Sequence, residues 1–175
     1  LITINNATSG KITLHKPDQP LTGTTDKLKQ ALDGTITGNY QGNLIISDKE
    51  TTAIQATDLS FIAGKTNGTI TVDKAIDING SATEVAAAMT ETGFTAKTAT
   101  VSLTDKPHSL TELKQINDAT DGSIVIHANR RGIPLEGSAN VLAAALDGIT
   151  NYTGPINVTG EVAHTLDELI TINNA

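Results

Sequence analysis

Acidic residues near turns are the side chains of this sequence that could act together, and the chemistry they suggest is cation binding. Calcium ions take several carboxylate and carbonyl oxygens as ligands. The sequence contains neither the spacing of an EF-hand loop nor a glycine-rich calcium-binding nonapeptide. We therefore expect no cofactor, with structural calcium as the alternative. The candidate calcium ligands are Asp48, Asp73, Asp77, Asp105 and Asp121.

Histidines and glutamates are the other candidates for metal binding or acid–base catalysis. His15 and His127 occupy one position of an internal repeat, and His108 and His164 occupy another, so duplication accounts for all four. A metal site needs three or four convergent ligands. Three glutamates each follow a Ser or Thr by three residues, which is typical of a helix capping box; they are Glu84, Glu112 and Glu168. We expect no catalytic residues and no enzymatic activity.

Composition excludes several classes of protein. The 175 residues include no Cys, so disulfide scaffolds, thiol enzymes and Cys-based metal sites are excluded. With 12 basic and 19 acidic residues the net charge is −7, which disfavours nucleic acid as a partner. No apolar run reaches the ~18 residues that a membrane span needs. Thr is abundant and aromatic residues make up 2%, so we expect a thin, aliphatic core.

An internal repeat organises the chain. The septet LITINNA at residues 1–7 recurs letter for letter at residues 169–175, an offset of 168. Within that span, three related blocks place Gly10, Gly68 and Gly122 at equivalent positions. We expect the chain to be a piece of a longer tandem array. The predicted units are repeat 1 (1–50), repeat 2 (51–107), repeat 3 (108–163) and the start of the next 168-residue unit (164–175).

The first half of each repeat predicts a short helix followed by a strand. In repeat 3, Leu110, Leu113 and Ile116 form one apolar helical stripe, and Ser109 supplies a capping box. A glycine turn, Asp121-Gly122 here and Asn67-Gly68 in repeat 2, is expected to end such helices. Alternating apolar residues then predict a strand. This strand contains Ile12 and Leu14 in repeat 1, and Ile70 and Val72 in repeat 2.

The second half of each repeat predicts another helix and another strand. In repeat 2, Ser81 and Glu84 cap a helix whose apolar side carries Val85, Ala88 and Met89. In repeat 3, Leu142, Ala145 and Leu146 form the equivalent apolar side. An alternating strand closes each repeat, at residues 43–47, 100–104 and 155–159.

Short helices that alternate with strands predict the α/β class with parallel sheet. We expect a repeat solenoid of helix–strand coils with roughly 28 residues per coil. Short helices would cover one face of its sheet, and the other face would be exposed to solvent and rich in Thr. The alternative is a string of small α/β domains of about 56 residues each.

Two segments carry a resemblance to a known kind of protein. TELKQINDATDGSIVI from Thr111 and GSATEVAAAMTETG from Gly80 resemble the tandem-repeat regions of giant bacterial, cyanobacterial-type, cell-surface and adhesin-like fibrous proteins. The resemblance implies an extracellular, structural protein without catalytic residues. We expect a surface fibre, filament, stalk or surface-layer element whose partners are neighbouring repeats or identical subunits. The alternative is an adhesive module whose Thr-rich sheet face binds a glycan, ice or a host surface.

Overall fold

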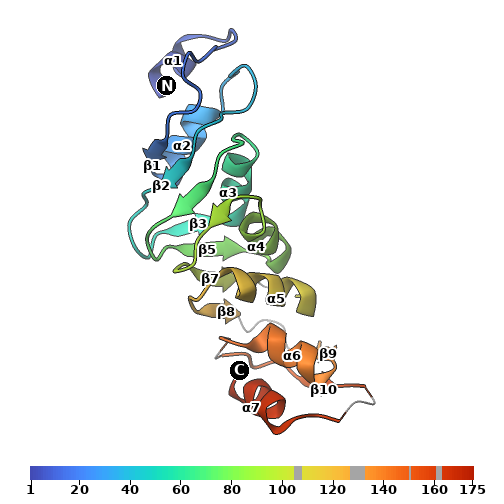
Figure 1. The fold of residues 1–175 in the computed structure, drawn as a ribbon. Helices are drawn as coiled ribbons and strands as arrows, with labels where there is room; N and C mark the ends of the chain where they lie inside the picture. Colours follow the sequence, from blue (N-terminus) through green and yellow to red (C-terminus); the bar gives the residue numbers. More distant parts are fainter. Residues whose placement is uncertain (105–107, 127–132, 150, 161–162) are drawn as a thin grey trace.

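The computed structural model describes residues 1–104, 108–126, 133–149, 151–160 and 163–175, and its helices are stacked along an elongated molecule (Figure 1). Each helix contacts the next one in the chain, from the first to the last. This stacking lets short helices persist, because helices of this length are marginal in isolation. The helices are α1 (Ile2–Ala7), α2 (Thr25–Leu32), α3 (Ala56–Ala63), α4 (Ala82–Met89), α5 (Leu110–Ala119), α6 (Ala139–Leu146) and α7 (Leu166–Asn174).

Strands on the other side of the molecule form parallel sheets. The described strands pair in the orders β1-β2-β4-β6, β3-β5-β7-β8 and β9-β10, and every pair is parallel. The predicted α/β class with parallel sheet is therefore confirmed. The strands are β1 (Leu21–Gly23), β2 (Leu44–Ile46), β3 (Ala53–Gln55), β4 (Ile70–Val72), β5 (Asp77–Gly80), β6 (Phe94–Thr95), β7 (Thr100–Leu103), β8 (Ile124–Ile126), β9 (Leu135–Gly137) and β10 (Ile156–Val158).

Strand pairing follows the sequence repeat. The strand before the second helix of a repeat pairs in parallel with the strand that closes the same repeat. This pairing joins β1 to β2, β5 to β7 and β9 to β10, with Leu21 opposite Leu44, Ile78 opposite Val101, and Leu135 opposite Ile156. Equivalent sequence positions thus make equivalent backbone contacts.

The core lies between the helices and the sheets and is almost entirely aliphatic. Alternate residues of β4 point inward, so that Ile70 and Val72 are buried while Thr71 is only partly covered. The helices contribute their predicted stripes, for example Leu113 and Ile116 of α5. One cluster of buried side chains runs from α2 to the residues after α6. At roughly 1.5–3 kcal/mol for each buried Leu, Ile or Val side chain, this cluster supplies the main stabilisation of the fold.

Three capping boxes predicted from the sequence are confirmed. The hydroxyls of Ser81, Ser109 and Thr165 each accept a hydrogen bond from the backbone N–H three residues later. In return, the Glu at that position accepts one from the N–H of the capping residue. Each cap satisfies two N–H groups that would otherwise lack partners at the start of a helix. The helices therefore begin where the sequence pattern placed them.

The simple alternation of one helix and one strand is wrong. Two strands separate most neighbouring helices; β4 and β5, for example, lie between α3 and α4. The additional strands are β1, β3, β5, β6 and β9, and their two to four residues are too short for a clear local pattern. These segments are extended because each pairs with a neighbouring strand. That partner is distant in the sequence, so a local pattern does not predict the strand.

The expected strand at Ile12 and Leu14 is also wrong. Ile12 forms an isolated parallel bridge with Ile36, and Leu14 lies outside any strand. The equivalent segments β4 and β8 are full strands because each pairs with an earlier strand, β2 or β7. Among the described residues, the one bridge of residues 12–14 is with Ile36, which comes later in the chain.

Candidate functional site

Asp48, the first calcium candidate, caps a helix. It is 9% exposed, and its Oδ2 accepts hydrogen bonds from both the backbone N and the Oγ1 of Thr25, each at 2.7 Å. Thr25 is the first residue of α2, where a carboxylate also interacts favourably with the helix dipole. The Asp48 carboxylate therefore holds the strand that closes repeat 1 to the helix before it.

The other calcium candidates do not converge on Asp48. Asp77 lies on β5 and accepts hydrogen bonds from the Ser102 hydroxyl at 3.0 Å and the Thr100 hydroxyl at 3.2 Å, both on the neighbouring β7. Asp73 and Asp121 are exposed, and Asp105 lies outside the described residues. Within the described part of the chain, no group of three or more His, Asp or Glu side chains is placed to hold a metal ion.

Glu112 joins two helices in addition to capping its own. Its Oε1 accepts a hydrogen bond from the Thr83 hydroxyl of α4 at 2.6 Å, and its Oε2 accepts from the N and Oγ of Ser109. Burial alone would raise the pKa of Glu112. The hydrogen bonds from Thr83 and Ser109, together with nearby His108, outweigh burial and leave this pKa below its usual value. Glu112 is thus held as a carboxylate in a structural contact.

The histidines are dispersed. His108 is buried just before α5, whereas His15 and His164 are exposed. His127 lies outside the described residues. The structure therefore does not bring the described histidines together at one position.

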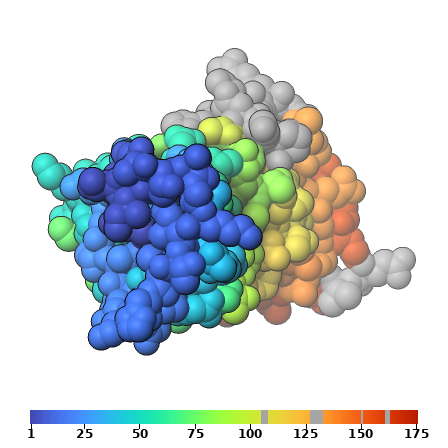
Figure 2. Space-filling view, turned by 90° about the horizontal axis from the view of Figure 1, so that it is seen from above, coloured from blue at the N-terminus to red at the C-terminus, as the bar shows by residue number. Residues whose placement is uncertain are grey.

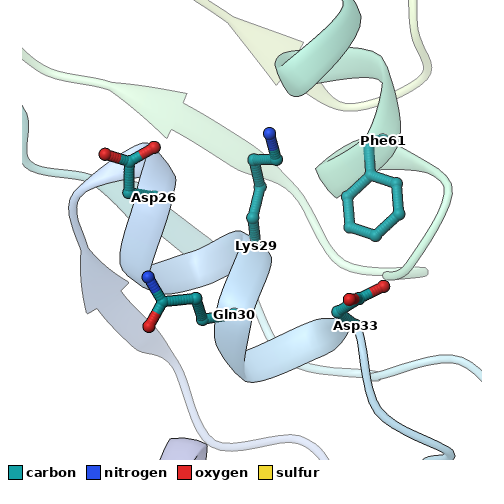
Figure 3. Close-up of a pocket in the computed structure, with 5 residues that line it drawn as sticks. All are labelled: Asp26, Lys29, Gln30, Asp33 and Phe61. Atoms are coloured by element: carbon teal, nitrogen blue, oxygen red, sulfur yellow. The ribbon is translucent and has the colours of Figure 1, made fainter.

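A shallow groove of about 360 Å³ lies between α2 and α3 (Figure 3). Its lining includes Asp26 at the start of α2 and Asp33 at its end, so these carboxylates are far apart along the helix. Lys29 extends from the middle of α2 and pairs with Asp58 of α3 at 2.5 Å. Lys65 lies over the Phe61 ring, 4.9 Å from its centroid. The Lys29–Asp58 pair joins adjacent helices, whereas the Lys65–Phe61 contact lies at the end of α3 alone. Sequence reasoning did not single out either contact.

The same pair of hydrogen bonds recurs at two copies of a Thr-x-Gly motif, Thr66 to Gly68 and Thr120 to Gly122. The hydroxyl of Thr120 donates a hydrogen bond to the Ala99 carbonyl at 2.6 Å and accepts one from the Gly122 N–H at 3.0 Å. Thr66 makes the equivalent contacts with the Gly42 carbonyl at 2.9 Å and the Gly68 N–H at 3.0 Å. Each motif thereby fixes its turn to the preceding layer of the stack.

The glycines of this motif are required by close packing. A Cβ atom on Gly68 would overlap the backbone of Gly42, and one on Gly122 would overlap the backbone of Ala99. Neither glycine has a positive φ. The expectation that these glycine turns end the helices is wrong, because α3 ends at Ala63 and α5 at Ala119, before either glycine. What the glycines permit is close approach of two backbones.

Thr66 and Thr120 join adjacent layers, and sequence reasoning missed both. Both are buried, although Thr is usually an exposed residue. The available signal was the Thr that stands two residues before each anchor glycine, at Thr8, Thr66 and Thr120. An ST-type turn explains a Thr at such a position locally, but the second bond to the preceding layer depends on the fold.

None of the helices in the described residues is long and apolar enough to cross a membrane. Comparison of the chain with protein-family models, with curated proteins and with solved structures gave no match.

Proposed function

We propose that this chain is a structural, non-enzymatic segment of an extracellular tandem-repeat protein. In this proposal it forms part of a surface fibre, filament, stalk or surface-layer element. Its architecture would be a three-repeat solenoid that grows by adding equivalent layers. The stacked helices and the equivalent strand pairs of the three sequence repeats support this arrangement.

The observation that carries the proposal is the Thr-x-Gly motif. The Thr of this motif joins each of two successive repeats to the layer before it. Thr66 donates a hydrogen bond to the Gly42 carbonyl, and Thr120 donates one to the Ala99 carbonyl. Contacts between nearest neighbours that recur with the repeat are the basis of solenoid growth, since each added unit buries the surface that its neighbour leaves open. A protein built in this way gains length without needing a new core.

The architecture is tested with tandem polypeptides of one, two and three copies of residues 8–175, joined directly. Small-angle X-ray scattering would give the maximum dimension of each. A solenoid predicts a nearly constant increase in length for each added copy and a constant cross-section. Independent small domains would give a flexible string whose cross-section and length vary. That second result would contradict the solenoid and favour the alternative of separate domains.

The location and role are tested on the source cells. We expect antibodies against this chain to label intact cells, and immunogold particles to lie on fibres or on a surface layer in electron micrographs. The denatured mass of the native polypeptide is expected to be well above the 18.2 kDa of this chain. Labelling that requires permeabilised cells would overturn the extracellular proposal.

A binding face is the second candidate, and the strand register favours it. Thr22, Thr71 and Thr95 lie in one column across the sheet β1-β2-β4-β6, with Ile45 in the same column. These side chains are exposed or partly exposed, as expected for an adhesive face. Screening the chain on a glycan array and in an ice-recrystallisation assay tests this function. Thr71→Lys would be expected to abolish any activity found.

A further inference from the structure

The groove between α2 and α3, the α2–α3 groove, combines an aromatic ring with polar side chains. Its lining residues are Asp26, Lys29, Gln30, Asp33 and Phe61. Phe61 of α3 is partly exposed, and its ring lies across the groove from α2 (Figure 3). Asp26, Gln30 and Asp33 of α2 are all exposed. The groove therefore presents one apolar surface and several hydrogen-bonding groups to the solvent.

These side chains depart from the repeat pattern. Lys29 and Gln30 of repeat 1 align with a pair of alanines in each of the other repeats, at residues 86–87 and 143–144. Phe61 occupies a position that is a glutamine in α5. With these smaller or polar residues, α4 still stacks on α5, and α6 stacks on α7. Stacking of the helices therefore does not require the polar and aromatic side chains of this groove.

Two side chains of the groove are held in place by contacts within the chain. Lys29 pairs with Asp58 of α3 at 2.5 Å, so its ammonium group already has a partner. The Phe61 ring packs against the core, and the ammonium group of Lys65 lies 4.9 Å from the ring centroid. A binding surface that its own chain holds in position loses little conformational entropy when a ligand arrives.

The other polar side chains have unused hydrogen-bonding capacity. Within the described residues, the side chains of Asp26, Gln30 and Asp33 have no hydrogen bond or ion pair. The carboxylates accept hydrogen bonds, and the amide of Gln30 both donates and accepts them. Such a mixture of groups suits a ligand with several hydroxyls, because each hydroxyl also donates and accepts.

The charges around the groove favour an uncharged ligand. The carboxylates of Asp26, Asp33 and Asp58 repel an anion. The ammonium groups of Lys29 and Lys65 repel a cation. A neutral ring with hydroxyls at its edge and C–H groups on its face matches both the polar side chains and the aromatic surface. Sugars in their ring form have this chemistry.

We propose that the α2–α3 groove binds an uncharged sugar ring within a polysaccharide. The Phe61 ring contacts the C–H face of the sugar, and Gln30 and Asp33 bind its hydroxyls. The groove volume of about 360 Å³ is within the range of small-molecule sites. Asp26 lies about 10.5 Å from Asp33 along the helix axis, at 1.5 Å per residue. The polar groups thus extend beyond one ring, so a neighbouring ring of the same polysaccharide contacts Asp26.

Repetition strengthens this binding, and this step rests on the proposed structural function. A tandem array would carry one such groove in every 168 residues, because the groove lies between repeat 1 and the start of repeat 2. In the view along the stack, segments of the chain reach the surface side by side in sequence order (Figure 2). A long polysaccharide that contacts successive grooves is held more tightly than a single ring, since each later contact is intramolecular.

The binding experiment is an NMR titration of the 175-residue polypeptide with isotope-labelled Phe rings. The chain has two Phe residues, so Phe61 reports on the groove and Phe94 of β6 is the internal reference. The uncharged probes are maltohexaose, cellohexaose and mannohexaose, and the charged probes are oligogalacturonate and oligomeric chitosan. We expect at least one uncharged probe to shift the Phe61 signals with a dissociation constant of about 1 mM. The Phe94 signals are expected to stay unchanged, and the charged probes to have no effect.

Two substitutions test the groove residues. Phe61→Leu keeps an apolar side chain against the core but removes the aromatic ring. We expect the dissociation constant, measured from the backbone amide signals of α2, to rise about tenfold. Gln30→Ala introduces the residue of the other two repeats and is expected to raise it about threefold. Gln115→Ala is the matched control, because Gln115 is exposed at the position in α5 that aligns with Phe61; its binding is expected to equal that of the original chain.

The same titration separates this groove from the Thr column of the sheet β1-β2-β4-β6. Thr71→Lys alters that column and leaves the groove intact, so we expect this variant to retain binding. Loss of binding in Thr71→Lys together with full binding in Phe61→Leu would overturn the groove and assign the binding to the Thr column. Circular dichroism and urea unfolding confirm that each variant is folded.

Three other results would overturn the groove: no shift of the Phe61 signals at uncharged-probe concentrations well above the expected dissociation constant, equal binding by Phe61→Leu and the original chain, or tighter binding of a charged probe. The structural function is tested separately, because scattering from tandem copies measures length without any sugar. If tandem copies do not elongate while the single chain binds an uncharged probe, the array is wrong and the groove stands.

Discussion

The hydroxyl of Thr120 lies 2.6 Å from the carbonyl oxygen of Ala99 and donates a hydrogen bond to it, joining residues 21 positions apart. Because Thr120 is buried, water cannot replace this bond if it is lost. Thr120→Val keeps the shape of the side chain but leaves the Ala99 carbonyl and the Gly122 N–H without it. We expect the free energy of unfolding in urea to fall by about 1–3 kcal/mol.

Thr8→Val is the matched control, since Thr8 holds the same position in repeat 1. Its hydroxyl accepts a hydrogen bond from the Gly10 N–H at 2.9 Å, and both residues are exposed. Water can replace that bond, so we expect a loss below about 0.5 kcal/mol. Equal losses for the two variants would show that the bond to the preceding layer adds nothing to stability.

Gly122→Ala tests the close approach of two backbones. The added methyl group would overlap the Ala99 carbonyl, which belongs to a paired segment and cannot move independently. We expect a loss of about 1–3 kcal/mol, which is typical of overpacking, measured by urea unfolding. Gly64→Ala is the control, because its Cβ would have no neighbour closer than 3.6 Å. If Gly122→Ala is as stable as Gly64→Ala, the packing argument is wrong.

The sequence was sufficient to predict features whose causes are local. The caps at Ser81, Ser109 and Thr165 depend on residues three positions apart, and all three are confirmed. The stripe containing Leu113 and Ile116 is confirmed for the same reason. Helical periodicity and capping depend on residues within one or two helical turns of each other. A short stretch of sequence is therefore enough to predict them.

Features that depend on a neighbouring layer were missed. β5 is extended because it lies between β3 and β7, and nothing within its four residues requires that conformation. Likewise, the sequence makes Asp48 a candidate calcium ligand and gives no sign of its hydrogen bond with Thr25. Thr25 lies 23 residues away and becomes adjacent only after the layers stack. Long-range polar partners of this kind require the register between layers, which periodicity alone does not provide.

Asp48→Ala is expected to destabilise the chain without any involvement of calcium. The substitution leaves the Thr25 N–H and hydroxyl without their buried acceptor, so we expect a loss of about 1–3 kcal/mol in urea unfolding. Asp121→Ala is the control, since Asp121 is exposed. We also expect EDTA to leave the unfolding midpoint of the original chain unchanged. A midpoint that falls in EDTA and recovers with added calcium would instead establish the structural-calcium alternative.

Glu112 makes the stability of the chain depend on acidity. Its pKa is lower in the folded chain than the ordinary value of 4.5, because the hydrogen bonds from Thr83 and Ser109 and the nearby His108 outweigh the opposing effect of burial. A lowered folded-state pKa stabilises the fold fully at pH values above 4.5. This stabilisation is lost as the pH falls from 4.5 through the folded-state pKa, since the folded chain then has to take up the proton.

Glu112→Gln keeps a side chain that can complete the capping box but cannot titrate. We therefore expect the free energy of unfolding to decline less steeply between about pH 5 and pH 3 in this variant than in the original chain. Urea unfolding at closely spaced pH values measures the two slopes, and Glu136→Gln, at an exposed position, is the control. If the Glu112→Gln curve runs parallel to that of the original chain, Glu112 makes no contribution to acid sensitivity. Its hydrogen bond with Thr83 would then matter only for joining α4 to α5.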